Sequence, residues 1–434
     1  MPVRLDANAT DFEAAFAEVL AAQRESDSDV NDTVAAILKD VKARGNAAVI
    51  DYTARFDKLD LTPEALRIST SEIEAATAQC APGTLEALDL AAKRIEAFHA
   101  KQVPEGLDYT DEAGVRLGLR WSAMAAVGLY VPGGLAAYPS SVLMNALPAK
   151  VAGVDRVAMV VPTPGGVLNP LVLAAAKICG IDEVYRIGGA QAVGALAYGT
   201  ETIAPVDKIV GPGNAYVAAA KRQVFGTVGI DMIAGPSEIL VVADGENDPG
   251  WIAMDLMSQA EHDPSAQSIL ITDDAAFADA VEKAVQGHLK RLPKSEIAGA
   301  SWADHGAVIV VPDMDRAVSL VDRIAPEHLE LAVADPQALA SKIRHAGAMF
   351  LGRFTPEAVG DYVAGPNHVL PTSRSARFSS GLGVPDFLKR TTFIQCDSDS
   401  LSRIGPAAVT LARAEGLDAH GDSVALRLNM PTGD

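Results

Sequence analysis

The fold is decided by a stretch that passes from a short strand through two glycines into a helix, Lys208-Ile209-Val210-Gly211-Pro212-Gly213-Asn214-Ala215-Tyr216. A β-branched run that ends in Gly and Pro and is followed by a helical segment is typical of a βα unit in a parallel sheet. The start of such a helix is a candidate phosphate cradle. Tyr216 stands where the dinucleotide fingerprint has its third glycine, so the usual pyrophosphate mode is not assumed.

The same unit recurs along the chain on both sides of this stretch. Strands are predicted at 127–131, 156–161, 183–187 and 208–210, with helices such as 171–179 and 215–224 between or after them. A second series of strands is predicted at 238–243, 268–272, 307–311 and 348–351, and it alternates with helices at 251–261, 275–289, 314–324 and 336–344. The alternation predicts an α/β protein with two doubly wound, incomplete Rossmann-like parallel-sheet domains and small appendages at both ends.

Five parts are expected from this pattern. An N-terminal helical segment covers 1–25, and a helical region over 26–120 is expected to pack with the second sheet domain. The first sheet domain covers 121–236, the second covers 237–384, and a small C-terminal domain covers 385–434. The joint between the sheet domains is placed at Ala234-Gly235-Pro236-Ser237, where adjacent Gly and Pro break any regular pattern.

Composition excludes several classes of protein. The chain has 434 residues, 49% of them hydrophobic, and a formal net charge of -20, with basic residues scattered, so nucleic acid is not an expected partner. No signal segment and no long uncharged apolar run is seen, so we expect a cytoplasmic protein without a membrane partner. The three cysteines, Cys80, Cys179 and Cys396, lie far apart, which argues against disulfides or a thiolate zinc site. All three are expected to pack in the core.

A metal site is suggested by Gln259 and His262 at the end of the predicted helix 251–261. Residues three apart share a helix face, so the amide and the imidazole can point at one ion. A solvated helix end would show the same pair. Two ligands do not hold a metal, and the downstream candidates to complete the site are Asp361, His368, Glu415 and His420.

A second candidate for chemistry is Glu327-His328, which follows Pro326. Neighbouring helix residues point about 100° apart, so both can serve one cavity only from a turn or a helix start, which Pro326 favours. A carboxylate beside an imidazole suits two proton transfers, although a solvated pair would look the same. The histidines outside the candidate sites, His99, His288, His305 and His345, are expected at the surface.

Two more glycine loops end predicted strands, Pro132-Gly133-Gly134 and Gly188-Gly189-Ala190-Gln191. Each loop by itself fits a ligand contact or a plain chain reversal. Three such loops in one domain favour a nucleotide site.

Together these residues resemble the histidinol dehydrogenase family. The resemblance is carried, in family order, by Gly128-Leu129-Tyr130-Val131-Pro132-Gly133-Gly134, Gly188-Gly189-Ala190-Gln191-Ala192, Lys208-Ile209-Val210-Gly211-Pro212-Gly213-Asn214, Ala234-Gly235-Pro236-Ser237-Glu238, Ser258-Gln259-Ala260-Glu261-His262, Pro326-Glu327-His328-Leu329, Gly360-Asp361-Tyr362, Asn367-His368-Val369-Leu370-Pro371-Thr372 and Leu417-Asp418-Ala419-His420. It spans most of the chain after residue 120 and is looser before it.

The resemblance implies a set of site residues and partners. One zinc ion per subunit would be bound by Gln259, His262, Asp361 and His420, and NAD would contact Tyr130, Gln191 and Asn214, which makes 121–236 the NAD-binding domain. Substrate contacts are implied at Ser237, His328, His368 and Glu415, together with the metal ligands. The family also implies a homodimer in which 385–434 contributes to the partner's active site.

The implied reaction is the four-electron oxidation of L-histidinol through L-histidinal to L-histidine, with two NAD⁺ used in turn. His328 is the expected base for the alcohol proton, and Glu327 is expected to activate water. One alternative is a family relative that oxidises another small polar alcohol, such as a sulfonated diol, for which an added Arg or Lys would be expected in the pocket. A catalytically silent metal- or nucleotide-binding protein is the other alternative.

Overall fold

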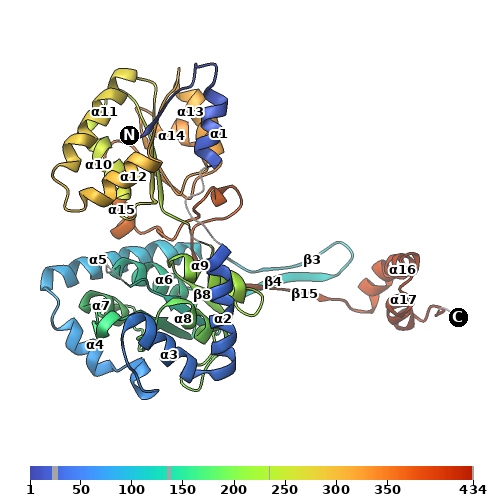
Figure 1. The fold of residues 1–434 in the computed structure, drawn as a ribbon. Coiled ribbons are helices and arrows are strands. Elements are labelled where there is room, and N and C mark those ends of the chain that lie inside the picture. The colour runs from blue at the N-terminus through green and yellow to red at the C-terminus, as the bar shows by residue number, and fades with distance from the viewer. Residues whose placement is uncertain (22–27, 134–137, 234, 433–434) are drawn as a thin grey trace. The chain divides into compact units, whose positions relative to one another are not determined.

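The computed structural model describes residues 1–21, 28–133, 138–233 and 235–432 (Figure 1). The chain forms two compact units, one of Met1–Gln102 with Ala125–Phe387 and the other of Val103–Met124 with Leu388–Asp434. The first unit contains two parallel sheets wrapped by helices, so the predicted α/β class is confirmed. Among the described residues, no helix has the length and apolar character needed to cross a membrane.

The first sheet has the strand order β2-β7-β6-β5-β8-β9. Its strands are β2 (Arg67–Ile68), β5 (Ala126–Tyr130), β6 (Arg156–Val160), β7 (Glu183–Tyr185), β8 (Lys208–Val210) and β9 (Gly229–Ile230). All pair in parallel except β2, which is antiparallel to β7. The chain order reverses between β5 and β8, and in open α/β sheets ligands bind in the crevice beyond the carboxyl ends of such strands.

Eight helices surround this sheet: α2 (Ser28–Arg44), α3 (Asn46–Asp57), α4 (Thr70–Thr77), α5 (Pro82–His99), α6 (Pro139–Val151), α7 (Pro170–Ile178), α8 (Gly189–Tyr198) and α9 (Ala215–Val224). Val34 and Val41 of α2 share a core with Val193 and Leu196 of α8. Helix α4 packs with α7, and α5 packs with α6. Helices α2 to α5 therefore cover the first sheet and not the second, contrary to the expectation for the region 26–120. Their apolar faces predict burial but do not say against which sheet.

The second sheet has the order β1-β12-β11-β10-β13-β14, and every pair in it is parallel. Its strands are β1 (Val3–Asp6), β10 (Glu238–Ala243), β11 (Gln267–Thr272), β12 (Ala307–Val310), β13 (His328–Ala332) and β14 (Ala348–Leu351). Figure 1 shows α10 (Pro249–Ala260), α11 (Ala275–Leu289) and α12 (Ser295–His305) on one face, and α1 (Phe12–Ala21), α13 (Met314–Ile324) and α14 (Pro336–Ala340) on the other. A short helix, α15 (Glu357–Tyr362), follows β14.

The second unit is built from two separate stretches of chain. An antiparallel sheet joins β3 (Leu107–Thr110), β4 (Arg116–Ala123) and β15 (Leu388–Gln395), and the helices α16 (Ser398–Ala414) and α17 (Asp418–Ala425) follow. The second unit thus includes the hairpin of β3 and β4, most of which was expected to belong to the helical region 26–120. Cys396, directly after β15, is exposed, and Cys80 is half-buried, so only Cys179 is a core residue as expected.

Candidate active site

The Glu327-His328 pair lies at the amino edge of the second sheet. Strand β13 begins at His328, with Glu327 in a bend before it, so of the two expected settings, a turn or a helix start, the helix start is wrong. In the sheet, His328 pairs with Ile239 of the neighbouring strand β10. Glu327 and His328 are 6% and 4% exposed, so they do not form a solvated pair.

The hydrogen bonds of His328 define which nitrogen can act as a base. Nδ1 lies 2.9 Å from the carbonyl oxygen of Glu238, an acceptor, so Nδ1 carries the proton and Nε2 keeps its lone pair. Within the described part of the chain, Nε2 has no hydrogen-bond partner. Burial lowers the pKa of His328 below its ordinary value, against the opposing effect of Asp361. The ring is therefore a neutral base at neutral pH.

Glu238 positions both members of the pair through its main chain. Its N–H donates to Oε2 of Glu327 at 2.8 Å, while its carbonyl accepts from His328. Oε2 of Glu327 is also 3.7 Å from Nδ1 of His328. The side chain of Glu238 in turn accepts from the N–H of Ser373 at 2.9 Å, which connects the pair to the segment after His368.

The end of α10 supplies the predicted metal ligands. Asp248 caps the helix start by accepting from the N–H of Gly250, and Ala260 ends it two residues before His262. Nε2 of Gln259 lies 3.2 Å from Nδ1 of His262, so the two side chains do share a face. Gln259 is fully buried, and its Oε1 has no partner among the described residues. Burial lowers the pKa of His262, which keeps the ring neutral, as ligation requires.

Asp361 of α15 joins these residues to the base. Its Oδ1 is 3.9 Å from Nε2 of His328 and 3.7 Å from Nδ1 of His368, and its charge opposes the lowering of the pKa of His262 by burial. His368 is held by two hydrogen bonds, between Nδ1 and the carbonyl of Asp361 at 3.0 Å and between Nε2 and Oγ of Ser141 at 3.4 Å. Ser141 lies on α6 of the first sheet, so His368 connects the two sheets of this unit.

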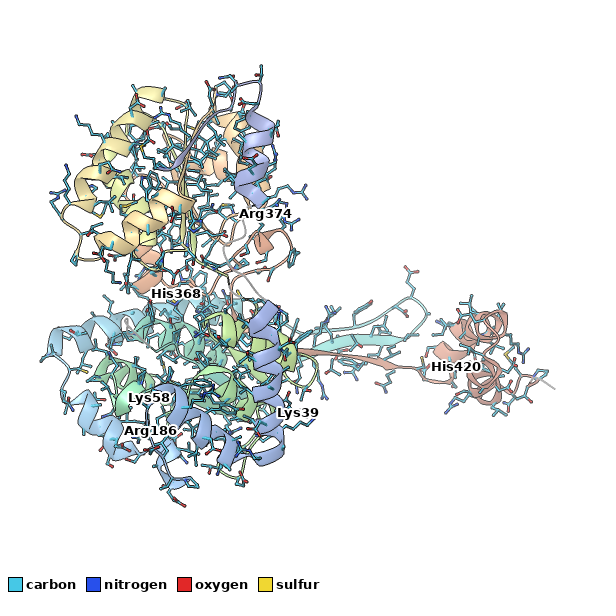
Figure 2. The ribbon with its side chains drawn as sticks, in the orientation of Figure 1. Lys39, Lys58, Arg186, His368, Arg374 and His420 are labelled. Atoms are coloured by element: carbon cyan, nitrogen blue, oxygen red, sulfur yellow. The ribbon has the colours of Figure 1, made fainter. Side chains whose placement is uncertain are left out.

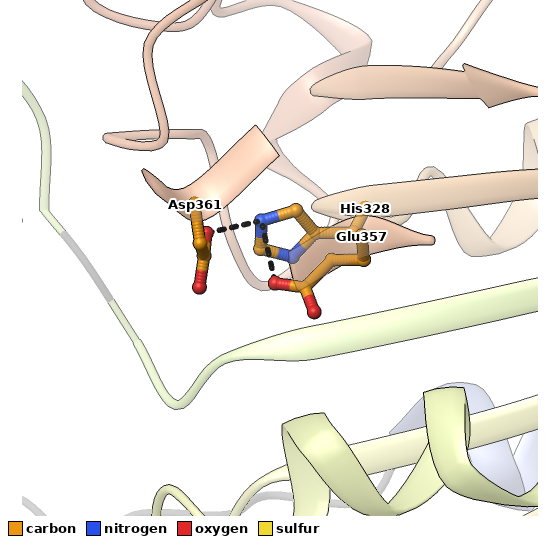
Figure 3. A group of neighbouring side chains, drawn as sticks. All are labelled: His328, Glu357 and Asp361. Carbon is orange, nitrogen blue, oxygen red and sulfur yellow. Dashed lines mark ion pairs between the residues drawn. The ribbon is translucent and has the colours of Figure 1, made fainter. Parts of the chain in front are cut away.

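One residue of the site was missed by the sequence analysis. Glu357 begins α15, is buried, and places Oε1 3.8 Å from Nε2 of His328. The ligand atoms of His328, Glu357 and Asp361 all lie within 4.8 Å of one another (Figure 3). Burial first, and Asp361 next, raise the pKa of Glu357 to about 10, so this carboxyl is protonated at neutral pH. In the sequence, Pro356-Glu357 looks like an ordinary acidic helix start, and no signal marks it.

The donors present fit a borderline divalent ion. The unpartnered Oε1 of Gln259, the neutral ring of His262 and the carboxylate of Asp361 form the mixed N/O set that zinc accepts. The fourth predicted ligand, His420, lies on α17 of the second unit, where it is exposed, as is Glu415 at the end of α16 (Figure 2).

The predicted NAD contacts lie at the carboxyl edge of the first sheet. Tyr130 ends β5 and its hydroxyl accepts from the N–H of Gly189 at 3.0 Å. Burial raises the pKa of Tyr130 to about 12, so the hydroxyl stays protonated. Gln191 is buried in the first turn of α8, and in the described structure its Oε1 is unpartnered. Asn214 is exposed, and its side chain caps α9 by accepting from the N–H groups of Tyr216 and Val217.

At the equivalent edge of the second sheet, the polar groups of the protein are paired with one another. At the carboxyl ends of β10 and β13, both carboxylate oxygens of Asp244 accept from Nη2 of Arg353, at 2.7 and 2.8 Å. Asn247 donates to the carbonyl of Ala332 at 2.6 Å, and Ala334 N–H donates to Asp244 at 2.9 Å. The first sheet is therefore the better candidate for a dinucleotide.

The remaining predictions have different outcomes. Ser237 is half-buried directly before β10, and its carbonyl accepts from the N–H of Gln267 at 3.0 Å. Gly134 and Ala234, named in the glycine loop and the hinge, lie outside the described residues. His99 is fully buried and its Nδ1 is 2.8 Å from the carbonyl of Ile95, so its expected surface position is wrong. It lies on the buried face of α5, one turn after Ile95.

Comparisons with known proteins show the family of this chain. The family model "Histidinol dehydrogenase" matches residues 20–428. Histidinol dehydrogenase of Rhodospirillum rubrum is 71% identical over 430 residues, 99% of each chain, and that of Ruegeria pomeroyi is 65% identical over 433 residues, 100% of each. The crystal structure of histidinol dehydrogenase from Elizabethkingia anophelis superimposes with a TM-score of 0.94 at 36% identity, covering 99% of this chain and 98% of that one. The chain belongs to the histidinol dehydrogenase family, a family of oxidoreductases.

Proposed function

We propose that this oxidoreductase converts L-histidinol to L-histidine through L-histidinal, with two NAD⁺ used in turn and one zinc ion per subunit. The observation that carries the proposal is the neutral, buried His328, whose Nε2 has no partner in the described structure and lies 3.9 Å from Asp361, a candidate zinc ligand. A base beside a metal-binding carboxylate is the arrangement that alcohol oxidation needs.

Zinc, when bound, would supply a positive charge that orients the amine and imidazole nitrogens of the substrate. Gln259, His262 and Asp361 would hold it together with His420. His368, whose Nδ1 lies 3.7 Å from Oδ1 of Asp361, is proposed to contact the substrate, as are Ser237 and Glu415.

In the first half reaction, Nε2 of His328 takes the proton of the alcohol while the carbinol hydrogen leaves as hydride to NAD⁺. The imidazolium that forms is stabilised by the hydrogen bond from Nδ1 to the carbonyl of Glu238 and by the carboxylate of Asp361. The proton must leave the ring before the second oxidation, because the same nitrogen is needed again.

In the second half reaction, water adds to the aldehyde, and Glu327 takes a proton from it. His328 then accepts a proton from the hydrate as the second hydride leaves. The carbon thus loses two hydrides and gains one oxygen from water. Burial of both side chains limits competing contact with bulk water.

We further propose a homodimer in which residues 385–434 of one chain supply Glu415 and His420 to the site of the other. The exposure of both residues supports this. The rings of Trp251 of α10 and Phe354, which pack in a tilted arrangement at 5.8 Å, are largely exposed and offer an apolar contact surface on the same unit.

The test is an assay of NADH formation with L-histidinol. We expect two NADH for each histidinol consumed, loss of activity on chelation, and recovery on addition of zinc. A sulfonated diol assayed in parallel should give no NADH. Absence of NADH with histidinol and added zinc would refute the proposed reaction.

A further inference from the structure

We infer that a buried ion pair, Lys221 with Asp231, positions the glycine loop 211–214 for the dinucleotide. The inference rests on the proposed use of NAD⁺ at the first sheet. Lys221 lies on the buried face of α9 and Asp231 directly follows β9, and neither belongs to the residues expected to touch NAD⁺. Their side chains are 3% and 1% exposed.

The pair holds both main-chain polar groups of Gly211. Nζ of Lys221, which pairs with Oδ1 of Asp231, donates to the carbonyl of Gly211 at 2.9 Å. Oδ2 of Asp231 accepts from the N–H of Gly211 at 2.8 Å, and its Oδ1 accepts from the N–H of Met232 at 2.7 Å. The two charges thus fix one peptide unit on each side of Gly211.

Gly211 is the point from which the rest of the loop takes its position. It follows β8 with a φ of +109°, and a Cβ there would lie 2.1 Å from the carbonyl oxygen of Tyr130, so no side chain fits. Three residues later, Asn214 caps α9. The loop therefore runs from the end of β8, close to the end of β5 at Tyr130, to the N-terminus of α9, at the point where the strand order reverses.

Stability alone is a poor explanation for this pair. Two charges removed from water lose their hydration, and apolar residues of similar volume often give an equal or higher stability. An ion pair at this place does what apolar residues cannot, because it binds an N–H and a C=O of the loop at once. Both residues are accordingly positioning residues that act on the ligand through Gly211.

The same sheet offers a matched control pair. Arg156 begins β6 and Glu183 begins β7, and their side chains form an ion pair at 2.6 Å at the opposite, amino edge. The Arg156–Glu183 pair links two strands, whereas the Lys221–Asp231 pair links a helix to the residue after a strand. The Arg156–Glu183 pair makes no contact with the glycine loop.

The experiment compares Lys221→Met, Asp231→Asn and Arg156→Met in the zinc-loaded full chain. We expect the first two to raise the KM for NAD⁺ on the order of tenfold or more, with the KM for histidinol and the zinc content unchanged. Arg156→Met should lower the thermal midpoint and leave the KM for NAD⁺ as in the wild type.

The double variant Lys221→Met/Asp231→Leu separates positioning from folding, because it leaves no unpaired buried charge. Its thermal midpoint should recover toward the wild type while its KM for NAD⁺ stays raised. A KM for NAD⁺ within about twofold of wild type in this folded variant overturns the inference. If the wild-type chain itself proves independent of NAD⁺, the proposed cosubstrate is what fails.

Discussion

His328 and Glu327 each make a hydrogen bond to the main chain of the same residue, Glu238, one to its carbonyl and one to its N–H. Because these bonds hold the two side chains in fixed orientations, the nitrogen and the carboxylate proposed as bases are set before substrate binds. Burial raises the pKa of the neighbouring Glu357 and keeps that carboxyl protonated. We therefore expect the two glutamates of this site to have different roles.

Substitutions of the two proposed bases should have different effects on the rates of the two half reactions. Glu327→Gln keeps an oxygen that can accept from Glu238 but removes the base, so oxidation of histidinal should slow more than oxidation of histidinol. His328→Asn should slow both by about 10² to 10⁴, the usual size of general base catalysis. The measurement is the rate of NADH formation with each substrate separately. Equal losses for Glu327→Gln in the two half reactions would contradict the division of roles.

His99 should make the protein acid-sensitive. Burial lowers its pKa from the ordinary value of 6.5, so below that pH the unfolded chain binds a proton that the folded chain excludes. The folded state therefore loses stability as the pH falls through 6.5, by up to about 1.4 kcal/mol at pH 5.5. His99→Leu should show a smaller drop in thermal midpoint between pH 7.5 and 5.5 than the wild type. Other titrating groups act in both proteins, so an equal drop would show that His99 does not contribute.

At the scale of elements, the candidate active site is assembled from the ends of α10, β13 and α15. Each of these elements ends or begins at a candidate residue, His262 lying just after α10, His328 starting β13 and Asp361 lying in the last turn of α15. Cores on both faces of the second sheet fix α10 and β13, so the proposed ligands and base take their positions from buried packing. A metal site on such rigid elements is preorganised.

The contribution of α10 to metal binding can be measured directly. His262→Ala removes an imidazole ligand, and no cysteine lies nearby to replace it, so most of the bound zinc should be lost. His288→Ala, on the neighbouring helix α11, is the control and should keep its metal. Metal content by atomic emission is the measurement. Zinc retained at the wild-type level by His262→Ala would refute the assignment of His262 as a zinc ligand.

At the scale of the whole molecule, the two sheets share one strand order but differ at the carboxyl ends of their strands. At the second sheet Asp244 is paired with Arg353, whereas buried Gln191 at the first sheet has an unpartnered oxygen in the described structure. The proposed bases lie at the amino edge of the second sheet. We therefore expect one sheet domain to bind the dinucleotide and the other to perform the proton transfers.

We propose that a second chain completes the zinc site. Two variants that are each inactive should therefore restore activity when they form a mixed dimer. His262→Ala and His420→Ala should each be inactive, but a mixture that exchanges subunits contains heterodimers with one intact site. Activity should return to at most about a quarter of the wild-type level, because half of the dimers are mixed and each has one complete site. The readout is NADH formation after exchange has been shown by a tag. A mixture that exchanges and stays inactive would place His420 within its own chain's site.

What the sequence determined by itself is local. The alternation of strands, glycines and helices specified two doubly wound sheets, because each βα unit has its own periodicity and turn residues. The i, i+3 spacing of Gln259 and His262 was sufficient to predict that the two side chains meet at the end of a helix. These features depend on residues within one or two turns of each other.

Only the tertiary structure decided which of these elements meet. It placed the helices of 28–99 on the first sheet, buried His99, and added Glu357 to His328 and Asp361. The bond from His328 to Glu238 joins residues 90 positions apart, and no local pattern contains it. An apolar helix face or an isolated glutamate fits many partners equally well, and the choice among them is made by packing across the whole chain.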